Sequence, residues 1–492
     1  MDAMDNCNSR TDFFVALLRS ADRSLLISLM LVCWRILASL RAFSRRDLTP
    51  RSFQELEIRL ERLGRELARV LLQFALNKIE ASSLPHPIQW EYRTFHPIKR
   101  DSRSIETRLG TVEYCRWVYQ NELFFVRDVA AMDLRLGLID DRVSPALAHK
   151  LGRLAADLPQ QPAIEQLAEQ FDVRLSVDTY RKVVESLSYQ VRYLHDKVAI
   201  EQLTQWFAKA GKTEGKHEVL LLVGRDGVHV PMRGCWKEAG CATLAVYDRN
   251  RKRLGTIYLG EMPQSKQTEL TARLINVIQG TLQASSQMAI KLRYVTDAGS
   301  LPCSFYRKIL SKMKHPVTGK ILKWSWGVDF FHACEYVSQL SDSLFGVGTK
   351  GSQDWFKEQR HTLRHDTNGV RKVITRAAQQ KRRQGLVGSE KDYNSAKNYL
   401  SRYRAHMDYA KRRREGDPIG SGVTEAGCKV IFNQRMKQSG MRWSKKGGQW
   451  IVDLRTACRS KLWERIWDRY LSSFDQLPEI NQAYPSKTLA AA

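Results

Sequence analysis

The spacing of hydrophobic positions changes several times along the chain and predicts a different structure in each region. In residues 1–100 apolar side chains recur every three or four positions with charged residues between them, most regularly over residues 53–74. This period predicts a largely helical N-terminal region. Residues 53–74 form either a dimerising coiled coil or one helix of a packed domain. Residues 24–34 are an apolar run too short to span a membrane, so we expect a buried helix.

Residues 101–200 combine a β-rich segment with short helices. β-branched and aromatic residues on both sides of Gly110 predict a small hairpin. Farther on, residues 163–171 and 177–187 read as two helices joined by a short turn. Their spacing resembles a helix-turn-helix that reads a DNA groove, although any two short helices can imitate it.

Residues 215–345 alternate between apolar strands and helices. The order is β-β-β-α-β-α-β-α, which predicts an α/β fold with a mixed sheet covered by helices. The predicted strands are residues 218–223, 241–247, 255–259, 291–296 and 322–328, and the predicted helices are residues 265–282, 303–313 and a segment after residue 329.

Residues 346–417 show no strand pattern, so we expect a helical insertion there. Residues 418–475 open on a glycine-rich turn, in which Ser421 and Thr424 are good N-cap residues. A final core helix is therefore predicted from about Thr424, followed by basic C-terminal helices and a tail over residues 476–492.

The charge balance points to a polyanionic partner. The chain has 79 Lys and Arg against 52 Asp and Glu, a net charge of +27, and residues 350–470 alone hold 29 basic and 12 acidic residues. Such a surplus predicts nucleic acid as partner, although solubilising surface charge would give the same count. Nine cysteines without a C-x-x-C pair argue for reduced thiols in a cytoplasmic protein and against a structural zinc site.

Three carboxylates stand out among the acidic residues. Asp226 and Asp297 each follow an apolar run and precede a small residue, and Glu425 falls in the first turn of a predicted helix. Alone, each aspartate is better explained as a turn former. Together, in this order of elements and amid this charge, they suit two Mg²⁺ or Mn²⁺ ions, which prefer oxygen ligands and catalyse phosphodiester chemistry when about 4 Å apart.

Further polar residues are candidates for support and for DNA contact. Asp329 and His332 begin a predicted helix, where they either cap it or place His332 near a phosphate and the carboxylates. The candidate contacts to DNA are Arg412, Arg413, Lys429, Arg435, Lys437, Arg442, Lys445 and Lys446.

Several stretches together resemble a known family. They include Arg-Asp-Gly-Val-His-Val-Pro-Met at residues 225–232 and Pro-Ile-Gly-Ser-Gly-Val-Thr-Glu at residues 418–425, and the others are residues 295–299, 329–333, 406–409, 435–437 and 439–443. Over residues 105–470 the chain resembles bacterial insertion-sequence transposases of the DDE type with an RNase H-like catalytic core, and most of all the Kra-type insertion-sequence family.

The resemblance implies specific roles and partners. Asp226, Asp297 and Glu425 would be the catalytic, metal-binding triad, with the helical insertion between Asp329 and Glu425. Asp329-x-x-His332 is similar to a signature of Mutator-type and hAT-type transposases. The region near Cys115 lacks the paired cysteines of a zinc ribbon, so a metal-stabilised finger is not expected there.

The implied activity is cleavage of DNA at the ends of an insertion element, followed by attack of the freed 3′-hydroxyl on target DNA. Its partners would be the terminal inverted repeats, target DNA and a second copy of the chain, as a homodimer or higher oligomer. We expect a cytoplasmic, nucleoid-associated bacterial protein without membrane association. Alternatives are a transposase-derived DNA-binding protein without catalysis and an RNase H-like nuclease without strand transfer.

Overall fold

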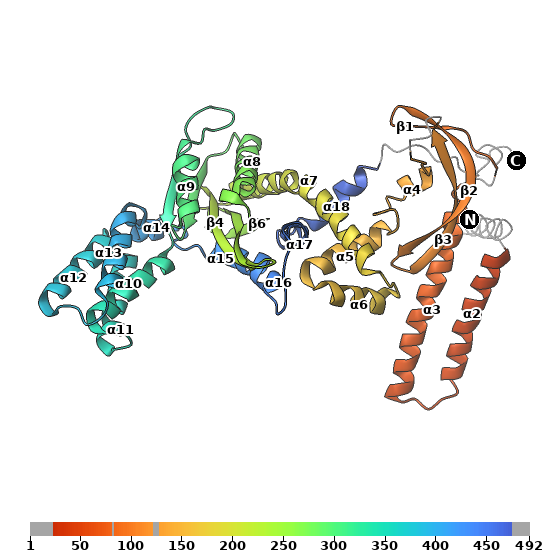
Figure 1. Ribbon diagram of the computed structural model, residues 1–492, viewed down its shortest axis with the longest axis horizontal. Coiled ribbons are helices and arrows are strands. Elements are labelled where there is room, and N and C mark those ends of the chain that lie inside the picture. The colour runs from red at the N-terminus through yellow and green to blue at the C-terminus, as the bar shows by residue number, and fades with distance from the viewer. Residues whose placement is uncertain (1–22, 81–82, 122–126, 475–492) are drawn as a thin grey trace. The chain divides into compact units, whose positions relative to one another are not determined.

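The computed structural model describes residues 23–80, 83–121 and 127–474. The protein is a mixed α/β protein (Figure 1). It has two compact units, the first being Met1–Leu187 with Asp468–Ala492 and the second being Ser188–Trp467.

The first unit begins with a hairpin of two helices, α2 (Arg23–Phe43) and α3 (Pro50–Asn77). Thr49 caps α3 in a reciprocal pair of hydrogen bonds with Ser52, which satisfies amide groups that the helix leaves free. The prediction of a helix over residues 24–34 is confirmed, but the prediction that it is buried is wrong. Only 11% of the apolar window in α2 is buried, and the described element that packs against it most extensively is α3.

The helix α2 is also the one helix in the described residues that is long and apolar enough to cross a membrane, by length and composition alone. The run of residues 24–34 that the sequence singled out is therefore only part of a longer apolar helix, which extends to Phe43.

A three-stranded antiparallel sheet follows, with β1 (Ile88–Trp90), β2 (Arg93–Thr107) and β3 (Gly110–Asn121) in that order. The predicted hairpin at Gly110 is confirmed, and Gly110 has φ +103°, which a side chain would disfavour. The strands start at Ile88, so the largely helical region predicted for residues 1–100 ends before residue 100, and the prediction is wrong from β1 onward.

Helices complete the first unit and lead into the second. They are α4 (Ala131–Arg135), α5 (Pro145–Asp157), α6 (Gln160–Phe171) and α7 (Val177–Gly211). The two helices predicted over residues 163–187 are confirmed as α6 and the start of α7. The second of them is much longer than predicted, at 35 residues, and runs on into the second unit.

The second unit is built on a five-stranded mixed sheet, in the order β6-β5-β4-β7-β8. The central strand β4 pairs antiparallel with β5 and parallel with β7. All five predicted strands are present, and their bounds are β4 (Val219–Pro231), β5 (Trp236–Tyr247), β6 (Arg253–Glu261), β7 (Ile290–Thr296) and β8 (Trp324–Val328).

The remaining elements of the second unit are helices, and the described residues 346–417 contain no strand, as predicted. The α-helices are α8 (Thr268–Ala284), α9 (Ser300–Lys308), α10 (Phe330–Phe345), α11 (Lys350–His365), α12 (Gly369–Gln384), α13 (Glu390–Tyr403), α14 (Tyr409–Arg414), α15 (Gly422–Cys428), α16 (Gln434–Met436), α17 (Lys445–Arg459) and α18 (Trp463–Ser472), the last of which crosses into the first unit. The short turns are η1 (Ser265–Gln267), η2 (Leu310–Lys312), η3 (Arg404–His406) and the π-helical η4 (Lys429–Asn433).

A cluster of ion pairs anchors the segment after α14, where the chain comes back from the helices α11–α14 to the sheet. Lys291 of β7 lies 2.7 Å from Glu415 and 2.9 Å from Asp417, and Arg251 lies 3.0 Å from Asp417. Arg293, also on β7, bonds both acids. Because Asp417 is almost fully buried, its charge depends on these three cations for compensation in the interior. The cluster thus holds the segment that leads into α15 against β7.

Candidate functional site

Asp226 and Asp297 lie at the same level of two neighbouring parallel strands. The register between β4 and β7 ends at the pair Gly224↔Val295, and each aspartate comes two residues after its member of that pair. Asp297 directly follows β7, as predicted. Asp226 differs from the prediction, because β4 does not end there but continues to Pro231 along β5. It therefore marks the end of the β4–β7 pairing rather than the end of a strand.

The helix α15 packs closely against β4 and β5 at this point. A Cβ atom added to Gly224 would lie 1.8 Å from the hydroxyl oxygen of Thr424, so only glycine permits this approach. The hydroxyls of Thr243 on β5 and Thr424 on α15 are hydrogen-bonded at 2.9 Å. The helix starts at Gly422, close to the predicted position, and this packing carries Glu425 in its first turn toward β4.

Asp329 braces the turn that precedes α15. It is 1% exposed, and its Oδ1 accepts a hydrogen bond from the backbone N–H of His332 at 2.7 Å, which caps α10. Its Oδ2 accepts one from the backbone N–H of Ser421. The Ser421 hydroxyl in turn donates to Glu425 Oε1 at 2.6 Å. Asp329 therefore connects the end of β8 to the start of the helix that carries Glu425.

The three carboxylates are close enough to influence one another. Burial raises the pKa of Asp226, and the negative charge of Asp297 raises it further, with a smaller contribution from Glu425. Two neutral donors work in the opposite direction: the Gly227 N–H at 2.7 Å and the Cys428 sulfhydryl at 3.5 Å. Negative charge is thus gathered around a partly buried carboxyl at the point where the β4–β7 pairing ends.

In this structure the side chains of Asp226, Asp297 and Glu425 are not arranged around a common metal position. Among the described residues, no group of three or more His, Cys, Asp or Glu side chains is placed to hold a metal ion. One oxygen of each carboxylate accepts a hydrogen bond from its own neighbourhood, from Gly227 N–H for Asp226, from Gly299 N–H for Asp297 and from the Ser421 hydroxyl for Glu425. Mutual repulsion also favours keeping three like charges apart.

A hollow of about 360 Å³ adjoins Asp297. His332 lines it together with Tyr336 and Tyr399, whose rings stack at 3.7 Å, and the Tyr399 hydroxyl donates to the backbone carbonyl of Asp297 at 2.8 Å. Ala298 in the same wall has φ +68°, a left-handed conformation that costs a non-glycine residue roughly 1–2 kcal/mol. His332, half exposed and 2.9 Å from Glu335, therefore shares a cavity with Asp297.

Two of the arginines predicted to contact DNA, Arg412 and Arg435, have buried side chains. The Arg412 guanidinium occupies the space above Gly327 and donates to the carbonyl of Trp326, and burial lowers its pKa to about 10. Arg435 is 2% exposed and lies 5.3 Å above the ring of Trp443. The other six candidates are exposed: Arg413, Lys429, Lys437, Arg442, Lys445 and Lys446.

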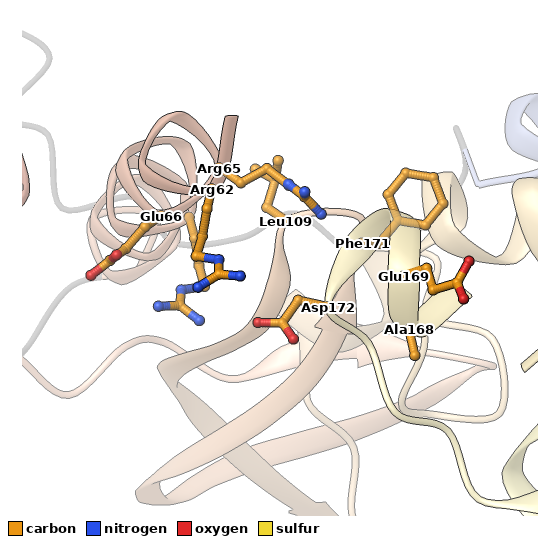
Figure 2. A pocket seen from close by; sticks show the side chains of 9 residues that line it. Arg62, Arg65, Glu66, Leu109, Ala168, Glu169, Phe171 and Asp172 are labelled. Atoms are coloured by element: carbon orange, nitrogen blue, oxygen red, sulfur yellow. The ribbon is translucent and has the colours of Figure 1, made fainter. Parts of the chain in front are cut away.

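A second hollow, lined by arginines, lies within the first unit and was not anticipated from the sequence. It has a volume of about 450 Å³, and Arg62, Arg65 and Arg69 of α3 line it. Figure 2 shows Arg62 and Arg65 on one side of this hollow and the end of α6, with Phe171 and Asp172, on the other.

The two sides of this hollow differ in charge: arginines of α3 line one side, and the α6 side carries an aromatic ring and acidic residues. Arg65 donates to the carbonyl of Gln170, while Arg108 and Lys150 lie 5.2 Å and 6.0 Å from the ring of Phe171. Glu169 and Asp172 add negative charge at the α6 end. The signal was present in the sequence, because arginines at 62, 65 and 69 share one face of a helix. The three arginines were not singled out as a binding site because they also fit the solvent-exposed polar face of an ordinary amphipathic helix.

A scan against models of protein families and a search of curated proteins found no match for this chain.

Proposed function

We propose that this chain is a DNA transposase of the DDE type with an RNase H-like core, which cuts DNA at the ends of an insertion element and joins the freed ends to target DNA. One observation carries the proposal. Asp226 and Asp297 lie two residues beyond the last register pair of two adjacent parallel strands, and the pKa of Asp226 is raised by burial, then by Asp297 and to a smaller extent by Glu425.

A purely structural role does not account for this grouping. Carboxylates that stabilise a fold are normally paired with cations, as Glu415 and Asp417 are with Lys291 in the same unit. Gathering three carboxylates instead costs stability, and such costs concentrate at functional sites. The glycine at position 224 and the brace from Asp329 maintain the arrangement in spite of that cost.

The donor set fits hard divalent cations. It consists of carboxylate oxygens around a partly buried group, which suits two Mg²⁺ or Mn²⁺ ions held by Asp226, Asp297 and Glu425 once their side chains turn toward a common centre. When bound, such ions activate an attacking oxygen and stabilise the leaving oxygen of a phosphodiester.

The exposed cations supply the means to bind the substrate. Lys429 follows Glu425 by one helical turn, and Lys437, Arg442, Lys445 and Lys446 are exposed on the segment that follows. Cations of this kind neutralise backbone phosphates and give binding that weakens steeply with salt. Arg62 and Arg69 in the hollow of the first unit extend the same chemistry to the N-terminal region, where recognition of the element's ends is proposed.

The proposal is tested by replacing Glu425 with Gln. The Glu425→Gln side chain keeps its size and one acceptor oxygen but loses the charge that a hard cation requires. The substrate is linear duplex DNA carrying the sequences that flank the gene. Cleavage is followed on denaturing gels with Mg²⁺ or Mn²⁺, and binding is followed by mobility shift without metal. Glu218→Gln, an exposed glutamate just before β4, is the matched control.

We expect Glu425→Gln to bind DNA normally, to unfold at the wild-type temperature and to lose cleavage, while Glu218→Gln keeps all three properties. Cleavage by Glu425→Gln would remove this residue from the site. DNA binding by a wild-type chain that never cuts would favour the binding protein without catalysis. Cutting without joining to a second DNA molecule would favour the nuclease.

A further inference from the structure

The helix α2 carries a row of large apolar side chains that no described residue covers. Each is between 44% and 68% exposed. We call this row the α2 seam, and its members are Ile27, Met30, Leu31, Trp34, Leu37 and Leu40. Scattered exposed apolar residues are normal, but a contiguous apolar strip along a whole helix marks an interaction surface.

The spacing within the seam indicates what kind of partner fits it. Ile27, Met30, Trp34 and Leu37 follow one another at intervals of three, four and three residues. This is the alternation with which one helix packs its side chains between those of another in a coiled coil. A different side of α2, which includes the buried Val32, already packs against α3. The α2 seam is thus a second helix-packing face, and it lacks a partner among the described residues.

The α2 seam is poorly suited to a lipid bilayer, although α2 by itself is apolar enough to insert into one. Arg35, midway along α2, forms an ion pair with Glu66 of α3 at 2.8 Å. Inserting α2 would either break that pair or carry α3 into the hydrocarbon. Charged groups at such depth are expensive, and the same stretch of α3 carries many. They are Glu55, Glu57, Arg59, Glu61, Arg62, Arg65 and Arg69.

We propose that the α2 seam binds the α2 seam of a second copy of this chain, as an antiparallel helix pair related by a two-fold axis near Trp34. The seam is suited to itself, because Met30 and Leu37 lie on either side of Trp34 at similar separations, as do Ile27 and Leu40. An antiparallel pair also keeps the Arg41 residues of the two chains at opposite ends, whereas a parallel pair would bring these like charges together.

The exposed area is sufficient for such a contact. If each of the six side chains buries on the order of 100 Å², the seam supplies about 600 Å² per chain, and flanking residues bring this near the ~800 Å² per partner of a standard interface. The inference concerns assembly and does not depend on the proposed chemistry. It would hold for a DNA-binding protein without catalysis as well.

The first test measures self-association of the full chain by sedimentation velocity over a range of micromolar concentrations. The double variant Trp34→Glu/Leu37→Glu should weaken dimerisation by about 100-fold or more, because it places charges in a dry contact. Ile58→Glu is the matched control, since Ile58 is a similarly exposed apolar residue of the same hairpin outside the seam. The control should dimerise like wild type, and circular dichroism should show unchanged helix content in both.

The second test uses a native probe. Cys33 is exposed and precedes Trp34, so an antiparallel pair brings the two Cys33 residues close to each other. A short bis-maleimide should join two wild-type chains, and Cys33→Ser should abolish this product. Cys235→Ser, which removes another exposed thiol, should not.

Three results would overturn the proposal: a wild-type chain that remains monomeric, a dimer that survives Trp34→Glu/Leu37→Glu, or a dimer that Cys33 cannot cross-link. A chain that instead floats with phospholipid vesicles, and stops doing so in the double variant, would assign the seam to a membrane.

Discussion

Gly224 of β4 faces Thr424 of α15 across a gap that leaves no room for a side chain. Gly224→Ala should therefore push α15 away from the sheet, lower stability by about 1–3 kcal/mol as overpacking does, and abolish cleavage by displacing Glu425. Gly422→Ala is the matched control, because a Cβ atom at position 422 meets nothing within 4 Å.

Both variants are compared by thermal unfolding and by the cleavage assay described above. The control should keep its activity and its unfolding temperature. If Gly224→Ala cleaved DNA at the wild-type rate, close docking of α15 would not be needed for the site.

The second prediction concerns pH and the charge of Asp226. Its pKa in the folded chain is raised above 3.8, mainly by burial and then by Asp297. The folded state therefore binds this proton more tightly than the unfolded state. The stability that the group contributes is complete below the unfolded pKa and is lost as the pH rises through the folded pKa. Asparagine does not ionise, so Asp226→Asn does not lose stability as the pH rises through the folded pKa of Asp226. The variant should therefore be more stable than wild type at pH 7 by about 1 kcal/mol.

The measurement is thermal unfolding in a metal chelator between pH 4 and pH 8. The gap between Asp226→Asn and wild type should widen as the pH rises, and added Mg²⁺ should stabilise wild type alone. Asp354→Asn, an exposed aspartate on α11, should show no such gap. An Asp226→Asn variant less stable than wild type at pH 7 would contradict the inferred repulsion between Asp226, Asp297 and Glu425.

The third prediction concerns the hollow in the first unit. If Arg62 and Arg69 contact phosphates there, Arg62→Ala/Arg69→Ala should weaken DNA binding and reduce the slope of log affinity against log salt by roughly 2. Arg59→Ala, an exposed arginine of α3 outside the hollow, is the control and should leave the slope nearly unchanged. Equal slopes for the double variant and wild type would exclude the hollow from DNA binding.

The fourth prediction separates two arginines that are adjacent in the sequence. Arg412→Ala removes a buried side chain together with its hydrogen bond to Trp326, and it should destabilise the chain by about 3 kcal/mol. Arg413→Ala changes an exposed residue and should lower DNA affinity with little effect on the unfolding temperature. The pair is compared by thermal unfolding and by a binding titration at one salt concentration, and the reverse pattern would contradict the assignment.

The sequence alone was enough to predict the order of elements in the second unit, because each strand there is an apolar run bounded by polar turns. It was not enough to place Asp226 within β4. The polar residues Asp226 and His229 interrupt the apolar run, whereas pairing with β5 continues through backbone hydrogen bonds, which do not depend on apolar side chains.

Burial of individual charges was likewise beyond a reading of the sequence. Arg412 is buried because Gly327 leaves space for a guanidinium, and that space is formed by residues far apart in the chain. The exposure of α2 was missed for the opposite reason. An apolar run such as the one before Trp34 normally predicts burial, but burial requires a neighbour on every apolar face.

The contact between Asp226 and Cys428 has a consequence for synthesis of the chain. These two residues touch although they are 202 positions apart, with the helices α11–α14 between them. At about 5–20 residues per second, a ribosome takes on the order of 10–40 s to make that stretch. The basic helices α11–α14 are made in the later part of this interval, before α15. A nascent chain therefore contains the positive charge of these helices before its cluster of carboxylates is complete.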